Sequence, residues 1–140
     1  MPVVPRTKTR VLIVNPNTTA SMTEKVRAAA QAAAHDSTEV VATNPASGPA
    51  SIQGYHDAAL AVPGLLAAIG QHGDVDAVVV ACFDDTGLDA ARCATSVPVV
   101  GIGEAAFHAA SMLSCQLGRC SPSRPRSAPC SRRADPRCAA

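Results

Sequence analysis

The 140-residue sequence contains no tryptophan, one tyrosine and two phenylalanines. Proteins that bind single-stranded nucleic acid stack its bases on aromatic side chains, so this shortage argues against such a partner. No apolar run approaches the length of roughly 20 residues that a membrane-spanning helix needs, and we expect no membrane partner. The N-terminus also lacks the apolar segment of a secretory signal, which makes the cytoplasm, where cysteines stay reduced, the expected compartment.

Acidic and basic residues are divided unevenly along the chain. Residues 1–114 carry ten acidic and six basic side chains, a net charge of −4, whereas residues 115–140 carry six arginines and one aspartate, a net charge of +5. Four of the six cysteines lie in the same 26 residues, which hold one leucine and no valine, isoleucine or phenylalanine. So little apolar surface cannot offset the entropy of ordering, and we predict a disordered tail over 115–140.

Short apolar runs alternate with helical patterns before that tail. The runs predict strands over 10–14, 38–43, 77–81 and 98–102, and the patterns between them predict helices over 21–34, 55–69, 87–93 and 103–113. Ser21-x-x-Glu24 is typical of a capping box, and Pro63-Gly64 should bend or break its helix. The alternation predicts an α/β fold, with a parallel four-stranded sheet in the order 2-1-3-4 flanked by helices. We therefore divide the chain into an N-terminal extension (1–9), an α/β lobe (10–114) and the tail (115–140).

Two loops should meet where the order of this sheet reverses, which is where open α/β sheets bind ligands. The loop 15–19 offers amide and hydroxyl groups before a helix, suited to holding carbonyl or anionic oxygens. The loop 82–87 offers the thiol of Cys82, also just before a helix, where the positive end of the helix dipole favours a thiolate. Cys82 is therefore the candidate reactive residue.

Each of these residues also has a purely structural interpretation. Cys82 is compatible with a small buried hydrophobe, and Asn15 and Asn17 with turn residues around a proline. Asp84 and Asp85 are compatible with solvated or helix-capping acids. From the residues alone, both interpretations stay open.

Two other patterns carry less functional weight. Gly101-x-Gly103 with Ala106 fits the dinucleotide fingerprint G-x-G-x-x-A, but it follows the fourth strand and lacks the acidic residue expected about twenty positions later, so we interpret it as a close-packing turn. The histidines are scattered, and the tail cysteines form no C-x-x-C pair, so no metal site is expected.

Four motifs together make the chain resemble the hydantoin racemases, in the aspartate/glutamate racemase superfamily. The resemblance runs from about Arg10 to Leu113 and rests on Asn15-Pro16-Asn17-Thr18, Ser51-Ile52-x-Gly54-Tyr55, Ala81-Cys82-Phe83-Asp84-Asp85-x-Gly87-Leu88 and Pro98-Val99-Val100-Gly101-Ile102-x-Glu104-Ala105.

The resemblance implies a cofactor-independent racemase or epimerase built from two similar lobes, each supplying one cysteine as acid or base. It implies that Cys82 is one of these two groups and that Asn15, Asn17 and Thr18 hold the substrate and stabilise enolate charge. Glutamate and aspartate racemases have an Asn-Thr pair after this cysteine to bind a carboxylate. Phe83-Asp84 in that place favours a neutral ring as the small-molecule substrate, such as a 5-substituted hydantoin or an allantoin-like ring. Full-length relatives suggest a homo-oligomer.

The sequence departs from the family after residue 114, where a second lobe is expected. An Arg/Pro/Ser/Cys-rich tail is what a GC-rich gene yields when it is read out of frame, so we hypothesise a truncated or frameshifted racemase with impaired catalysis. Translating the nucleotide sequence beyond the Ser114 codon in the other frames tests this. The alternatives are a non-catalytic small-molecule binding module, a product without function, and a related lyase or isomerase on the same scaffold.

Overall fold

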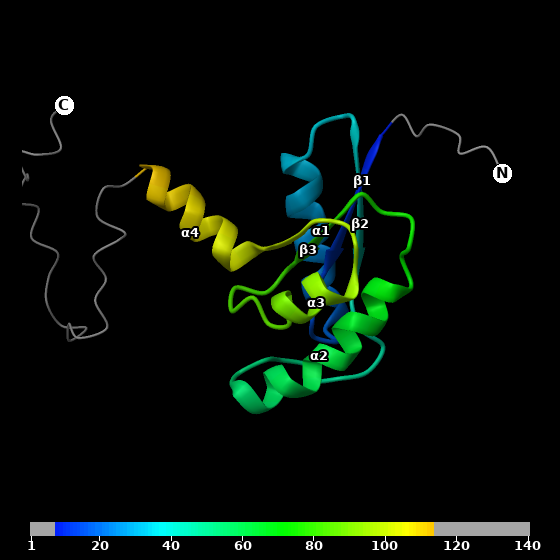
Figure 1. Cartoon of the computed structure of the whole chain (residues 1–140), viewed down its shortest axis with the longest axis vertical. Coiled ribbons are helices and arrows are strands. Elements are labelled where there is room, and N and C mark those ends of the chain that lie inside the picture. Colours follow the sequence, from blue (N-terminus) through cyan, green and yellow to red (C-terminus); the bar gives the residue numbers. More distant parts are fainter. Residues whose placement is uncertain (1–7, 114–140) are drawn as a thin grey trace, which may run out of the picture. The chain divides into compact units, whose positions relative to one another are not determined.

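Strands and helices alternate along the chain as the sequence predicts (Figure 1). The computed structural model describes residues 8–113, and its elements are β1 (Thr9–Val14), α1 (Ala20–Ala33), β2 (Thr38–Thr43), α2 (Tyr55–Gly70), β3 (Ala77–Val80), α3 (Leu88–Ala94), β4 (Val99–Gly101) and α4 (Ile102–Leu113). Every predicted element is present, and its bounds agree with the prediction to within about one residue.

The chain divides into two compact units, Met1–Glu104 and Ala105–Ala140. The first unit contains the sheet, α1 to α3 and the beginning of α4; of the second, residues 105–113 are described. The predicted tail over 115–140 lies outside the described residues. Within 8–113, none of the helices is long and apolar enough to cross a membrane.

The four strands form one parallel sheet in the order β2-β1-β3-β4, which confirms the predicted topology. Val14, at the end of β1, pairs with Thr43 of β2 and with Val80 of β3, and Val80 pairs with Gly101 of β4. The carboxyl ends of the strands therefore lie together, and we call this end of the sheet the carboxyl edge. The loops that follow β1 and β3 are neighbours there.

The main core lies between the sheet and the helices α2 and α3. Side chains alternate along a strand, so every second residue of β1 and β3 faces these helices. The core cluster consists of Leu12, Val14, Leu65, Ala68, Ile69, Val75, Val78, Val80, Leu88, Ala91 and Val99. Removing one such leucine or valine side chain from water contributes about 1.5–3 kcal/mol, so this layer holds the strand ends in place.

α1 lies against β1 and β2. Parallel crossovers are right-handed, and the crossover through α1 runs along the sheet in the opposite direction to those through α2 and α3. α1 therefore covers the other face of the sheet. Its buried residue is Thr23, whose hydroxyl is used by the loop that follows β1.

Two local features differ from the sequence prediction. The capping box is wrong, because α1 begins at Ala20 with Thr19 as its N-cap, so Ser21 already lies inside the first turn. α2 runs unbroken through Pro63, so of the two predicted effects, a bend or a break, the break is wrong. Pro63 is solvent-exposed, and the next residue, Gly64, lies so close to the preceding loop that a Cβ there would be 2.7 Å from the Ser47 carbonyl oxygen. Packing against that loop holds the helix together where the proline removes a hydrogen bond.

Candidate active site at the carboxyl edge

Cys82 lies two residues beyond the end of β3, in a tight turn. Its carbonyl oxygen accepts a hydrogen bond from the Asp85 backbone N–H at 3.0 Å. Its side chain is half-buried and packs against the core, and its sulfur lies 3.6 Å from the hydroxyl oxygen of Thr86, to which the thiol donates. Thr86 itself is buried. The thiol is thus held at a defined position but keeps access to solvent, unlike a fully buried structural cysteine.

The loop after β1 lies beside this turn because hydrogen bonding between the strands continues past their ends. The Ala81 N–H donates to the Val14 carbonyl at 2.8 Å, and the Asn15 N–H donates to the Thr43 carbonyl at 3.0 Å. The first of these bonds joins the ends of β1 and β3, so the loops 15–19 and 82–87 leave the sheet from neighbouring strands, as the predicted strand order requires.

Asn15 and Asn17 are both buried, and their side chains bond to each other and to the start of α1. The Asn15 amide donates to Asn17 Oδ1 at 2.9 Å and to Thr23 Oγ1 at 3.1 Å. Asn17 Oδ1 also accepts the Thr19 backbone N–H at 2.9 Å. These contacts match the turn-forming interpretation of the two asparagines, and their contact with a substrate stays a prediction.

Thr18 and Thr19 connect this loop to the segment before α2. The Thr18 N–H donates to the Pro49 carbonyl at 3.1 Å, and the Thr19 hydroxyl donates to the Ala50 carbonyl at 2.7 Å. Thr19 consequently makes no side-chain cap on its own helix. Backbone N–H groups in the first turn of α1 are thus left without a side-chain cap, at the positive end of the helix dipole, where they can bind a carbonyl or anionic oxygen.

Phe83 and Asp84, which the sequence analysis assigned to the substrate, follow Cys82 at the surface. Phe83 is 69% exposed, and Asp84 is exposed as well. An exposed ring next to the residue that carries the thiol can contact an apolar substituent, and this role stays a prediction.

Asp85 is a helix-capping acid, as one interpretation of the sequence held, but the helix it caps is distant in sequence. Its carboxylate accepts the backbone N–H groups of Gly103 at 2.9 Å and Glu104 at 2.7 Å, in the first turn of α4. The sequence analysis did not single out Asp85 as a site residue. No local signal marks this contact, because its partners are 18 and 19 residues away.

The Gly101-x-Gly103 motif packs directly on the Cys82 turn. A Cβ on Gly101 would lie 2.1 Å from Asp85 Oδ1, and one on Gly103 would lie 2.2 Å from the Phe83 carbonyl oxygen. The Asp85 carboxylate therefore occupies the place at this helix N-terminus where a dinucleotide phosphate would bind. The motif serves close packing.

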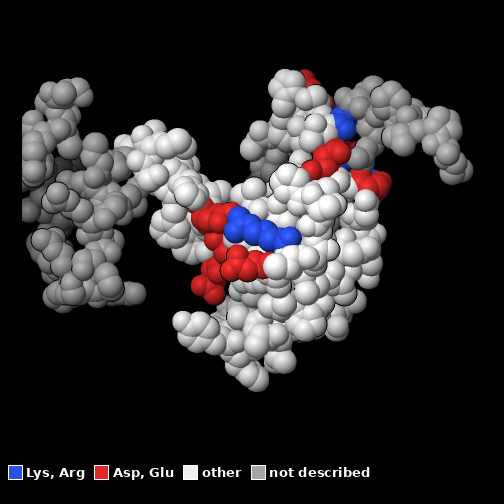
Figure 2. Space-filling model, viewed as in Figure 1, with Lys and Arg blue, Asp and Glu red and all other residues white. Residues whose placement is uncertain are grey.

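The basic side chain on α3 near the site is paired with acidic side chains. Arg92 of α3 forms ion pairs with Glu104 and Asp89, and its Nε donates to the Val99 carbonyl at 3.3 Å. Figure 2 shows acidic and basic side chains side by side on the visible face. No group of three or more potential metal ligands occurs among residues 8–113.

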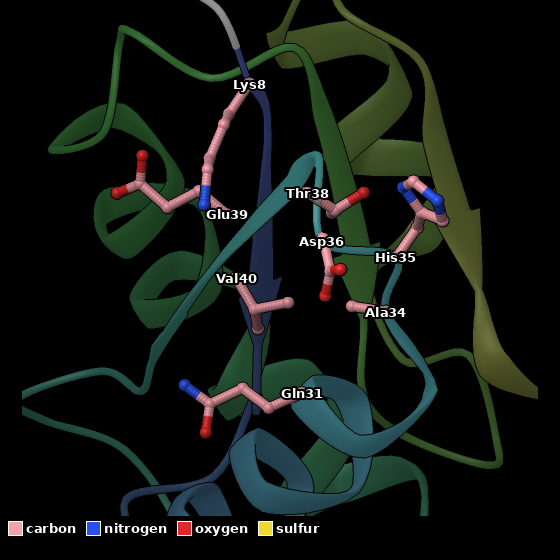
Figure 3. A pocket seen from close by; sticks show the side chains of 8 residues that line it. All are labelled: Lys8, Gln31, Ala34, His35, Asp36, Thr38, Glu39 and Val40. Carbon is pink, nitrogen blue, oxygen red and sulfur yellow. The ribbon is translucent and has the colours of Figure 1, made fainter.

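Two hollows in the described surface lie at the opposite edge of the sheet. The larger, about 520 Å³, is lined by residues at the beginning of β1 and β2 and the end of α1. Its side chains, among them Lys8, His35 and Glu39, point in different directions rather than toward one point (Figure 3). The smaller, about 210 Å³, lies where α2 and α3 lead into β3 and β4. Neither includes Cys82.

Comparison with known proteins agrees with this geometry. The family model "Asp/Glu/Hydantoin racemase" matches residues 11–121. The chain belongs to this racemase family. The resemblance carried by the four motifs is thereby confirmed, and the match extends seven residues beyond the predicted boundary at residue 114.

The racemase relatives are more than twice as long as the matched stretch. Hydantoin racemases from Pseudomonas sp. (strain NS671) and Rhizobium meliloti are 46% and 49% identical over 110 and 104 residues, which cover 77% and 73% of this chain but 44% and 43% of the relatives. An allantoin racemase from Klebsiella pneumoniae superposes with a TM-score of 0.72 at 46% identity, covering 75% of this chain and 44% of that one. Another, from Pseudomonas fluorescens, gives 0.71 at 36% identity. The chain therefore spans less than half the length of these racemases.

Proposed function

We propose that the chain carries one acid/base half of a cofactor-independent racemase, with Cys82 as the group that exchanges a proton with the substrate. The observation that supports this most is the position of Cys82. Its half-buried thiol stands at the carboxyl edge of the sheet, the same edge from which the loop after β1 leads into α1, and backbone N–H groups in the first turn of α1 have no side-chain cap. A proton acceptor and donors for an oxygen are the two components that proton abstraction next to a carbonyl requires.

In the proposed reaction, the Cys82 thiolate removes the proton from the chiral carbon. The electron pair of the broken C–H bond moves toward the adjacent carbonyl, whose oxygen gains negative charge and is stabilised by N–H groups of the α1 first turn. Inversion then requires a thiol on the opposite face to return a proton to the carbon. Among residues 8–113 the other cysteine is Cys93, an exposed residue of α3. We therefore propose that the second acid/base group belongs to the half of the racemases that this chain does not span, and that racemisation by this chain is impaired.

The proposed substrate is a neutral ring amide, such as a 5-substituted hydantoin or an allantoin-like compound. The names of the relatives, hydantoin racemase and allantoin racemase, support this class. Phe83 supports it too, because an exposed aromatic ring next to the thiol suits an apolar ring substituent better than a free carboxylate. Asp84, Thr18 and the two asparagines remain proposed contacts of the substrate.

The experiment is solvent deuterium exchange at the chiral carbon of a 5-substituted hydantoin, followed by NMR. The proposal predicts exchange above the uncatalysed rate that disappears in Cys82→Ala and persists in Cys93→Ala, the matched control. Binding of the hydantoin without exchange would instead favour a non-catalytic binding module.

A further inference from the structure

Asp85 forms the corner of the turn that carries Cys82. Its backbone lies in the left-handed region with φ of 50°, a conformation that few residues other than glycine, asparagine and aspartate adopt readily. Its N–H donates to the Cys82 carbonyl, and its own carbonyl accepts the Leu88 N–H, both at 3.0 Å. The backbone of Asp85 thus sets the path of the chain between the thiol and α3.

The side chain of the same residue connects this turn to a second, distant segment. Both carboxylate oxygens are used, one by the Gly103 N–H and the other by the Glu104 N–H. A carboxylate at a helix N-terminus accepts charge-assisted hydrogen bonds and interacts favourably with the helix dipole. The β4–α4 junction is therefore attached to the Cys82 turn by one side chain.

The glycines of the junction show that this attachment depends on close contact. At 2.1 Å from Asp85 Oδ1, a Cβ on Gly101 would displace the carboxylate, and Leu88 Cδ2 would lie 2.9 Å from the same atom. Arg92 of α3 contacts both the Val99 carbonyl and Glu104, so α3 also holds the junction in place. The turn is thus attached to a junction that α3 contacts as well.

We propose that Asp85 is a positioning residue for Cys82: its carboxylate attaches the 82–85 turn to the β4–α4 junction and so fixes where the thiol stands. This rests on the proposed function only in taking Cys82 as the acid/base group. Both carboxylate oxygens of Asp85 accept backbone N–H groups, so we assign this side chain to positioning and not to substrate binding. A site built for proton transfer needs its acid/base group held within fractions of an ångström, which explains a dedicated side chain for that purpose.

Three substitutions separate the effect of the Asp85 carboxylate from the effect of its left-handed backbone conformation. Asp85→Asn keeps a side chain that tolerates the left-handed backbone and retains one acceptor oxygen. Asp85→Gly keeps the backbone freedom and has no acceptor, whereas Asp85→Ala has neither. Asp89→Asn serves as the matched control, because the Asp89 side chain is 98% exposed and its ion pair with Arg92, at 3.7 Å, is a surface pair of little energy.

Two readouts are taken on the full-length protein, and neither requires turnover. One is the hydrogen-exchange rate of the Gly103 and Glu104 amides, and the other is the alkylation rate of Cys82 by iodoacetamide, measured by peptide mass spectrometry relative to Cys93. We expect Asp85→Gly and Asp85→Ala to raise amide exchange at least tenfold and Cys82 alkylation at least threefold, because loosening the turn exposes the half-buried sulfur. Asp85→Asn should bring both rates at least halfway back to those of the natural protein, on a logarithmic scale, and Asp89→Asn should leave them unchanged.

Gly101→Ala provides an independent route to the same result. In the otherwise unchanged protein it should accelerate Cys82 alkylation, because the new Cβ displaces the Asp85 carboxylate. In the Asp85→Gly protein there is no carboxylate to displace, so Gly101→Ala should change the alkylation rate less than twofold. If amide exchange rises in Asp85→Gly and Asp85→Asn while Cys82 alkylation stays constant relative to Cys93, Asp85 is a helix cap only and the proposal is overturned.

A different outcome would count against the proposed function alone. It is the absence of deuterium exchange at a hydantoin in a protein whose Cys82 alkylation rates follow the expected order.

Discussion

The sulfur of Cys82 lies 3.6 Å from the hydroxyl oxygen of Thr86, and Thr86 is buried beneath the turn. The thiol donates to this hydroxyl when it is protonated. Once the sulfur is a thiolate, the hydroxyl can reverse its role and donate to it, because a threonine hydroxyl is both donor and acceptor. Thr86 is therefore placed to stabilise both protonation states of the proposed acid/base group.

Replacing Thr86 with valine keeps the shape of the side chain and removes the hydroxyl. The hydrogen bond to the charged thiolate is stronger than the one that the neutral thiol makes, by about 1 kcal/mol, so we expect Thr86→Val to slow alkylation of Cys82 by iodoacetamide at neutral pH about fivefold. Thr86→Ser, which keeps the hydroxyl, should react within about twofold of the natural protein. Equal rates in the valine and serine variants would show that the hydroxyl does not act on the sulfur.

The buried bonds of Asn15 make a strong prediction about stability. Asn15→Ala leaves the partners Thr23 and Asn17 without the amide that they now contact, and a lost buried hydrogen-bonding partner costs about 1–3 kcal/mol. Urea denaturation should show a loss of this size. Ser21→Ala is the control, since Ser21 is exposed and is not the helix cap. The free energy of unfolding of Ser21→Ala should differ from that of the natural protein by less than about 0.5 kcal/mol. A larger loss would show that Ser21 caps α1 after all.

A third prediction concerns pH and the exposed pair Glu24 and Arg27 on α1. The Arg27 hydrogen bond, with Nε 3.0 Å from Glu24 Oε2, lowers the pKa of Glu24 below its ordinary value. A carboxyl whose pKa is lower in the folded protein adds stability above its unfolded pKa. That stability is lost as the pH falls below 4.5, the ordinary value, and through the folded one.

Glu24→Gln should therefore be slightly less stable than the natural protein at pH 7 and equally stable once the pH is well below the ordinary value of Glu24. Thermal unfolding at both pH values measures the difference. High salt should shrink it at pH 7, because the pair is exposed and screened. A difference that persists in acid would show that the effect does not come from the charge of Glu24.

The sequence sufficed for the elements and their order because the signals involved are local. Runs such as Val11-Leu12-Ile13-Val14 are typical of buried parallel strands, and right-handed crossovers leave few arrangements of four strands. The location of Cys82 followed from the same reasoning, since a residue just beyond a strand must lie at the carboxyl edge.

The contacts that define the site could not be read from the sequence because they join distant segments. The Thr19 side chain makes no cap on α1 because its hydroxyl bonds to Ala50, 31 residues away, and Asp85 accepts hydrogen bonds from residues 18 and 19 positions further on. Local spacing predicted a capping box at Ser21 and overlooked Asp85 for this reason. The Gly101-x-Gly103 motif did indicate part of this contact, because two glycines after a strand are typical of a segment against which another packs closely.

The central claim is that Cys82 exchanges a proton with the chiral carbon of a ring amide. Its most direct test is deuterium exchange in D₂O, measured by NMR separately for each enantiomer of a 5-substituted hydantoin. Since Cys82 supplies the thiol that the residues 8–113 bring to the site, we predict Cys82-dependent exchange that is faster for one enantiomer, with little inversion, and no exchange above background in Cys82→Ala. Exchange of the same rate in Cys82→Ala, or none with either enantiomer while the hydantoin binds, would contradict it.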